Sequence, residues 1–484
     1  MASKYDNYTR EQLVQRILDL ESHNIPSTDC QHTTVAPLIK NKKQKQRREK
    51  RPFDMSKYTQ RKIALRIAYL GWNYSGYASQ NKPDEVPTVE DKLFLALQTG
   101  HLIENIEDSD YSRCGRTDKG VSGLGQVIAL KVRSKKLREQ YEKDATLPPP
   151  AEEIPYIDML NRMLPPDIRV LAWTPVDDSF NARFDCTGRT YKYFFCNRHL
   201  NIANMQIACG YFEGQHDFRN FCKVDPSKNI TNYERHIRSM KIKPAEKLNQ
   251  HMSDDSSCSD LTSPSSATSF YELELKGSAF LWHQVRYMMS VLFMVGQGLE
   301  KPEIVLELLD IDKIPSKPDF PMASDLPLVL YDCEFKALQW YYSTQQGENK
   351  YEPIPSAYRT YLHYHEEWQK QMICTLTTQY YLNEVGSFLV TMPDEKKKDT
   401  VDAFDKVQSE LQQQQLSQRK GLGAVNLVIG GGKESKIAKY KPILLRPRCD
   451  SDELKKEKFQ ARKKRKLDQQ PEQSKDIAMK EQVE

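Results

Sequence analysis

Hydrophobic and polar residues alternate along several short segments in the middle of the chain. In residues 62–70 (KIALRIAYL), Ile63, Leu65, Ile67 and Tyr69 fall on one face, with the period of a half-buried strand. This alternation predicts a sheet. Its other strands are expected at residues 126–132, 169–176, 189–195, 270–277 and 332–342.

Helical periodicity occurs between these strands. Residues 88–100 begin with Thr88 as an N-cap and place Val89, Leu93 and Leu97 along one face. Two further helices are predicted at 156–164, which Pro165 and Pro166 end, and at 281–298. Because strands and helices mix without a strict βαβ repeat, the fold class is predicted to be α+β.

The flanking segments have a different composition. Residues 9–22 predict a short helix, either a stub of coiled coil or a lone surface helix. Residues 40–51 hold eight basic residues and one acid, which fits a solubilising run, a clamp on phosphates or a nuclear import signal. We therefore predict an N-terminal helix and basic disordered linker (1–59), a folded core (60–345) with a flexible insertion (248–269), a partly helical extension (346–450) and a basic disordered tail (451–484).

Composition narrows the class of protein. The 484 residues are 28% charged with a net charge of +5, and no apolar run of about 18 residues predicts a membrane-spanning helix. The N-terminus lacks the apolar stretch of a secretory signal. The ten cysteines stand apart without a CxxC pair, which indicates free thiols in a reducing compartment. No histidine pairs with a cysteine at a familiar ligand spacing, so no metal site is expected.

The stretch from Arg113 to Ser122 carries the most chemistry. It crowds Arg116, Asp118 and Lys119 together with two glycines into one loop before a predicted strand. An arginine beside a carboxylate lowers the pKa of that carboxyl group, and a carboxylate nucleophile must be ionised to attack. Glycines let a ligand approach the backbone closely. The alternative is an Arg–Asp ion pair that only braces a turn.

This loop resembles a known signature. Residues 115–122, GRTDKGVS, are similar to the GRTDxGVH-type motif of the TruA family of tRNA pseudouridine synthases. The resemblance implies the pseudouridine synthase fold, in which a mixed, mostly antiparallel sheet flanked by helices forms two halves around a central cleft. Further blocks follow in the family's order at residues 69–80, 166–170, 181–184, 189–193 and 283–286.

The resemblance also implies roles for individual residues. Asp118 would be the catalytic carboxylate that attacks either the sugar or the base, and Arg116 would pair with it and keep it ionised. Tyr191 would stack on the target base, and Arg286 would add a positive charge to the cleft. Lys119 stands where the bacterial signature has alanine, as an added phosphate contact or as a plain exposed lysine. The isomerisation needs no redox partner or group donor, so no cofactor is expected.

Basic and aromatic residues interleave around this predicted site. Such a mixture suits RNA, because phosphates attract cations and aromatic rings receive unstacked bases. The alternative is a solvated strand face with a packed aromatic side. The residues concerned are Arg113, Lys119, Arg183, Arg189 and Lys192 with Phe184, Tyr191 and Tyr193.

Three segments resemble the eukaryotic branch of the family that modifies tRNA positions 38 and 39. They are residues 216–223 (HDFRNFCK), 331–335 and 439–448. The implied protein is an isomerase whose partner is the anticodon stem-loop of tRNA, without membrane attachment, in the nucleus and the cytoplasm. A homodimer is one candidate assembly, because the bacterial relatives are dimers. The alternatives are the branch that acts at positions 27 and 28, a catalytically idle tRNA-binding protein, and a scaffold that recruits a partner through its N-terminal helix.

Overall fold

The protein was analysed in a computed structural model. It describes residues 53–80, 85–197, 200–227, 230–245, 270–336, 338–342, 356–389 and 425–468. All of them belong to Phe53–Glu484, the second of two compact units, the first being Met1–Pro52. The predicted helix at 9–22, the basic block at 40–51 and the insertion at 248–269 lie outside the described residues. None of the helices in the described part is long and apolar enough to cross a membrane.

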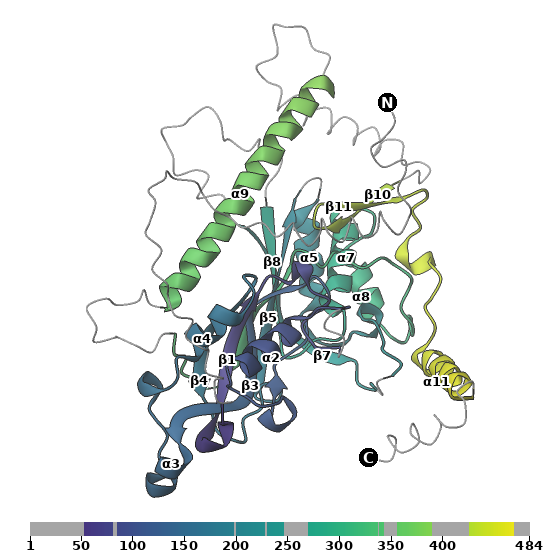
Figure 1. The fold of residues 1–484 in the computed structure, drawn as a ribbon. Coiled ribbons are helices and arrows are strands. Elements are labelled where there is room, and N and C mark those ends of the chain that lie inside the picture. The colour runs from purple at the N-terminus through teal and green to yellow at the C-terminus, as the bar shows by residue number, and fades with distance from the viewer. Residues whose placement is uncertain are drawn as a thin grey trace, which may run out of the picture. The chain divides into compact units, whose positions relative to one another are not determined.

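A nine-stranded sheet organises the described part of the chain (Figure 1). Its strand order is β4-β1-β3-β9-β5-β8-β7-β6, with β2 paired to β3. The β3–β9 pair is parallel, and the other strand pairs are antiparallel. The predicted mixed, mostly antiparallel sheet is therefore confirmed. The strands are β1 (Tyr58–Tyr69), β2 (Ser112–Arg113), β3 (Ser122–Leu137), β4 (Ile168–Pro175), β5 (Cys186–Cys196), β6 (Gly214–Asp217), β7 (Glu234–Pro244), β8 (Phe270–Gly277) and β9 (Leu328–Phe335).

Helices cover each half of this sheet. In the first half, formed by β1 to β4, α2 (Val89–Thr99) and α4 (Tyr156–Met163) pack on the strands, and α3 (Arg138–Asp144) follows β3. In the second half, α5 (Ile202–Phe212) and α7 (Gln284–Gly296) pack on the strands, and α8 (Ile304–Leu309) packs against α5. Short 3-10 turns lie at Met55–Lys57, Gly71–Asn73, Glu107–Ser109, Pro150–Glu152, Arg219–Phe221 and Ile443–Leu445.

Local sequence explains where two of these helices begin. Thr88 caps α2 as predicted, because its side chain accepts from the backbone N–H of Asp91 while the Asp91 carboxylate accepts from that of Thr88. Helix α7 starts at Gln284, three residues later than the predicted 281. The reason is His283, whose φ of 64° lies in the left-handed region and cannot continue a right-handed helix.

Each half has its own hydrophobic core. The first centres on Trp173, Leu65 and Leu160 between the sheet and its helices, and the second on Phe293 and Met289 of α7. A third, smaller cluster lies where the halves meet and takes residues from β1, β3, β5 and β9. The two halves are therefore joined by a continuous sheet and by buried contacts beside it.

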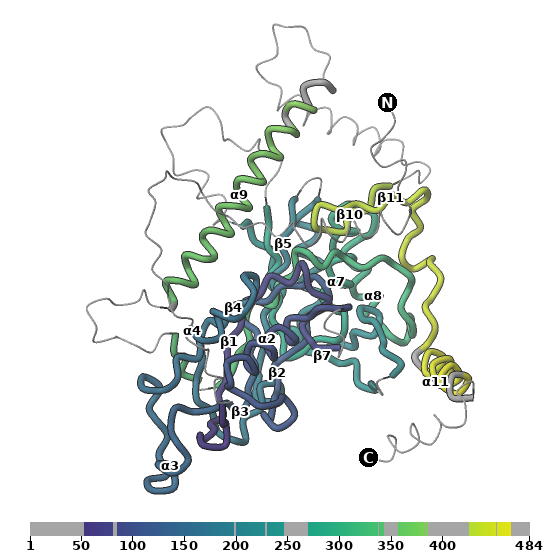
Figure 2. Tube along the Cα trace, in the orientation of Figure 1, coloured from purple at the N-terminus to yellow at the C-terminus, as the bar shows by residue number. Residues whose placement is uncertain are grey.

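The C-terminal part differs most from the prediction. Strands β10 (Val425–Gly430) and β11 (Lys433–Ile437) form a hairpin whose β10 packs on α7 (Figure 2). Leu427, Tyr440 and Ile443 are buried in the core of the second half. The predicted core boundary at residue 345 is thus too early, because the residues that close this core come much later in the chain.

Two long helices lie in the C-terminal region. The predicted helix after residue 345 is confirmed as α9 (Ser356–Leu389). Helix α11 (Asp452–Asp468) occupies part of the segment predicted to be a disordered tail. Its sequence is rich in lysine and arginine, which are good helix formers, and Ser451 Oγ accepts from the backbone N–H of Leu454 at its start.

Candidate active site

The loop that carries Asp118 connects β2 to β3 and is held by neighbouring backbone. The N–H of Tyr77 donates to the carbonyl of Thr117 over 3.1 Å, and the N–H of Gly120 donates to the carbonyl of Tyr74 over 3.1 Å. These bonds fix the loop on both sides of Asp118. The carboxylate is therefore presented from an ordered turn.

Two glycines are required, one in this turn and one in the segment that packs against it. Gly120 has a φ of +79°, and a Cβ there would lie 2.6 Å from Oδ2 of Asp325. Gly76 has a φ of +113°, and its Cβ would lie 3.1 Å from the carbonyl oxygen of Thr117. Both positions combine left-handed backbone with close packing, so only glycine fits without strain.

The Asp118 side chain lies at the junction of the two halves and is 21% exposed. Its Oδ1 accepts a hydrogen bond of 3.1 Å from Nε1 of Trp282, just before α7. Nε2 of His283 lies 3.6 Å from the same oxygen. The first half thus supplies the carboxylate, and the second half supplies the groups that face it.

Burial dominates the electrostatics of this carboxyl group. It raises the pKa of Asp118 to about 6, although Arg286 and the hydrogen bond from Trp282 act in the opposite direction. The expectation of a lowered pKa is therefore wrong. At neutral pH the group is still mostly ionised, and the desolvated anion is more reactive than one in water.

Arg116 does not hold Asp118 as predicted. Its guanidinium is exposed, and within the described ranges it forms no ion pair with Asp118. The turn directs the two side chains differently, so that Asp118 faces Trp282 while Arg116 faces solvent. The cations that act on Asp118 are Arg286 and, more weakly, Lys223. Arg286 is fixed by a 2.8 Å hydrogen bond from its Nε to the carbonyl of Ala323.

Tyr191 on β5 lies close to the candidate carboxylate. Burial raises the pKa of Tyr191 well above its ordinary value, and the charges of Cys333 and Asp118 raise it further. Its ring packs edge-on against Phe280 with centroids 5.1 Å apart. The structure therefore brings Tyr191 and Arg286 to Asp118, while Lys119 is exposed on the same loop.

Three residues at this site were given no role from the sequence. Trp282 and His283 contact Asp118, and the Lys223 ammonium lies 4.8 Å from the centroid of the Trp282 ring. The pKa of His283 is lowered to about 4 by burial and by the charges of Arg286 and Lys223, so this imidazole is neutral at neutral pH. Lys223 and His283 lie within the family-like segments 216–223 and 283–286, whereas Trp282 lies outside every such segment.

Much of the predicted RNA-binding mixture is structural. Arg113 pairs with buried Glu90, and Lys192 pairs with Glu272. Arg189 donates to the carbonyl oxygens of Cys114, Arg183 and Ser278. Tyr193 is fully buried, and its hydroxyl donates to the carbonyl of Ser324. Of the predicted group, the side chains that face solvent are Lys119, Arg183 and Phe184.

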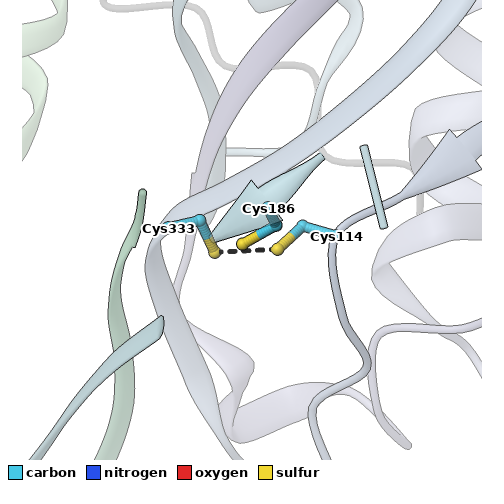
Figure 3. Close-up of side chains that lie close together, drawn as sticks. All are labelled: Cys114, Cys186 and Cys333. Atoms are coloured by element: carbon cyan, nitrogen blue, oxygen red, sulfur yellow. Dashed lines mark hydrogen bonds between the residues drawn. The ribbon is translucent and has the colours of Figure 1, made fainter. Parts of the chain in front are cut away.

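Potential metal ligands lie close together at the start of the loop and on β5 and β9, and not at Asp118. Over the described residues, one group of three or more ligand side chains is close enough to share an ion. It consists of Cys114, Cys186 and Cys333, all buried (Figure 3). The candidate active site itself holds the chemistry of a carboxylate, a phenol and cationic groups.

Comparison with known proteins gives a consistent answer. A family model described as tRNA pseudouridine synthase matches residues 208–336. The tRNA pseudouridine(38/39) synthase of Saccharomyces cerevisiae is 45% identical over 352 residues, which cover 70% of this chain and 73% of the yeast protein. The protein of the same name from Bos taurus is 37% identical over 449 residues, 92% of this chain and 86% of its own length. The tRNA pseudouridine synthase A of Methanothermobacter thermautotrophicus is 32% identical over 254 residues, 52% of this chain and 74% of its own.

Proposed function

This chain belongs to the family of tRNA pseudouridine synthases, and from that premise we propose that it converts uridine to pseudouridine at positions 38 and 39 of tRNA. The observation that carries the proposal is Asp118, an ionisable carboxylate held at the junction of the two halves by Trp282 and opposite Arg286. The positions come from the names of the eukaryotic relatives, which match most of this chain.

The reaction is an isomerisation. The bond between ribose C1′ and uracil N1 breaks, the base turns, and C1′ is joined to C5. The C5 carbon loses a proton and N1 takes one up. Atoms and electrons balance without an added reagent. In this reaction Asp118 acts as the nucleophile, and its partial burial keeps the anion reactive. Arg286 stabilises negative charge that develops beside it.

The target uridine is stacked in the anticodon stem-loop and has to leave the stack to reach Asp118. Extrusion costs a few kcal/mol, which contacts elsewhere must offset. Arg116 and Lys119 are exposed on either side of Asp118 and are placed to contact phosphates of the RNA backbone. Tyr191 presents an aromatic ring beside the carboxylate for the extruded base.

The test is pseudouridine mapping on unmodified tRNA incubated with purified full-length protein and no other component. The wild type is expected to modify positions 38 and 39, and Asp118→Ala to lose turnover by on the order of 10³-fold or more while it still binds tRNA. Asp312→Ala, which removes an exposed carboxylate, is the matched control and should retain full activity.

Other results would contradict the proposal in different ways. Modification at positions 27 and 28 would keep the family and overturn the positions. Unchanged activity of Asp118→Ala would remove Asp118 from catalysis. Bound tRNA without modification by the wild type would indicate a binding protein.

A further inference from the structure

Three cysteines from distant parts of the chain lie close together at the start of the loop that carries Asp118, here called the catalytic loop. Cys114 follows β2, Cys186 begins β5, and Cys333 lies on β9. Their sulfur atoms all lie within 4.8 Å of one another, and those of Cys114 and Cys333 are 3.2 Å apart (Figure 3). All three side chains are buried, with exposed fractions of 2%, 9% and 8%.

This spacing is close to that of thiolates bound to one metal ion. A zinc–sulfur bond is about 2.3 Å long, so three sulfurs on one ion lie roughly 3.8–4.0 Å apart. The sulfur atoms of Cys114 and Cys333, 3.2 Å apart, are closer than this distance, and no pair among the three is further apart than 4.8 Å, so binding an ion requires an adjustment of the side chains. Figure 3 shows the three sulfur atoms gathered at one place, although their residues come from three separate segments of the chain.

The surrounding charge selects the kind of ion. The Arg189 guanidinium donates to the carbonyl of Cys114 over 2.9 Å and interacts electrostatically with all three thiols. Three thiolates and one Zn²⁺ carry a net charge of −1, which Arg189 neutralises. With Cu⁺ the same group would remain negative, and an unbalanced charge is costly in a buried site.

The thiol of Cys186 also donates to the carbonyl oxygen of Gly188, with sulfur and oxygen 3.2 Å apart, so an oxygen atom lies beside the cluster.

We propose that Cys114, Cys186 and Cys333 bind one zinc ion, which fastens the start of the catalytic loop to strands β5 and β9. Binding releases the protons of the three thiols and forms three zinc–sulfur bonds, without a change of oxidation state. The ion stabilises the structure by holding Cys114, which lies four residues before Asp118. This site is independent of the proposed modification positions.

The first test is the metal content of the full-length protein, purified under reducing conditions without chelators. Mass spectrometry is expected to find one zinc per chain in the wild type and none in Cys186→Ser. Cys209→Ser is the matched control, because Cys209 is equally buried but lies in α5, outside the cluster, and it should retain the zinc. Zinc retained in full by Cys186→Ser would overturn the proposal.

A second test needs no variant and so does not depend on how well a substituted protein folds. The zinc-loaded wild type is alkylated before and after treatment with a chelator, and peptides are analysed by mass spectrometry. Cys114, Cys186 and Cys333 should become reactive together on metal removal, while Cys209 stays unchanged. Failure to retain added Zn²⁺, retention of copper in its place, or a disulfide among the three cysteines under reducing conditions would overturn the assignment.

Discussion

The carboxyl group of Asp118 has to ionise in surroundings that disfavour its charge. Burial raises its pKa from 3.8 to about 6, even with Arg286 and the Trp282 N–H nearby. A fully exposed carboxylate would ionise more readily but would be surrounded by water. The site therefore keeps the anion partly desolvated and oriented, which is the condition under which a carboxylate attacks well.

The rate of pseudouridine formation is predicted to depend on pH. Because the active form is the anion, single-turnover rates should rise with pH and reach half of their plateau near pH 6. The measurement is the rate of pseudouridine formation between pH 5 and 8 at constant ionic strength. A midpoint near pH 4 would contradict the buried environment described for Asp118.

Trp282→Phe serves as the control for this assignment. It retains an aromatic ring but removes the N–H that donates to Asp118, so the anion loses a hydrogen bond. The midpoint should move upward by about 0.5–1 pH unit. A profile that stays in place would assign the titration to another group.

At the scale of elements, the turn around Asp118 depends on glycine backbone. We predict that Gly120→Ala lowers turnover strongly, because a Cβ would both strain the left-handed backbone and collide with Asp325. Activity and thermal unfolding of the variant are measured together. The expected cost in stability is about 1–2 kcal/mol from the backbone alone.

Gly298→Ala separates the effect of backbone strain from the effect of the collision with Asp325. Gly298 has a similar φ of +67°, but a Cβ at this position would have no neighbouring atom within 4 Å, so only the backbone strain applies. It should lose about 1–2 kcal/mol of stability from this strain and keep its turnover. Equal loss of turnover in both variants would show that the position of the turn is not specifically required.

The C-terminal hairpin is part of the second core. We predict that Leu427→Ala lowers the free energy of unfolding by about 2–5 kcal/mol, because Leu427 is completely buried against the core that contains α7. Chemical denaturation measures the change. Leu445→Ala is the control, since Leu445 is 64% exposed, and it should be nearly neutral. Equal stability of the two variants would exclude the hairpin from this core.

For the whole molecule, the site is assembled from both halves. The loop of Asp118 belongs to the first half, whereas Tyr191, Trp282 and Arg286 belong to the second. The parallel pairing of β3 with β9 joins the two through Ser122–Val329 and Gly123–Leu330. A short stretch of sheet therefore sets the distance between the carboxylate and the groups that face it.

RNA binding is also a property of the whole molecule, because it sums many phosphate contacts. The affinity for tRNA should fall with salt, and Arg116→Gln and Lys119→Gln should each reduce the slope of log K against log salt by about 0.7–0.9. Binding is measured by titration at several salt concentrations. Lys301→Gln, which removes an exposed charge elsewhere, should leave the slope unchanged. An unchanged slope for the first two variants would place the RNA away from this loop.

The sequence by itself determined many strands and helices of the core, its fold class and the position of the loop that carries Asp118, whereas β7 and α5 were not predicted. Strand alternation in residues 62–70 and the cap at Thr88 are local patterns, so they can be recognised without knowing what lies nearby. The motif around Asp118 is contiguous for the same reason, and it identified the family that the comparisons confirm.

Only the tertiary structure decided what surrounds these residues. Trp282 meets Asp118 across 164 positions of sequence, Arg286 replaces Arg116 as the acting cation, and burial reverses the expected direction of the Asp118 pKa shift. The three cysteines converge only through the pairing of the strands. Burial and Coulomb interactions depend on distances between remote segments, and such distances are set when the sheet assembles rather than by any local pattern.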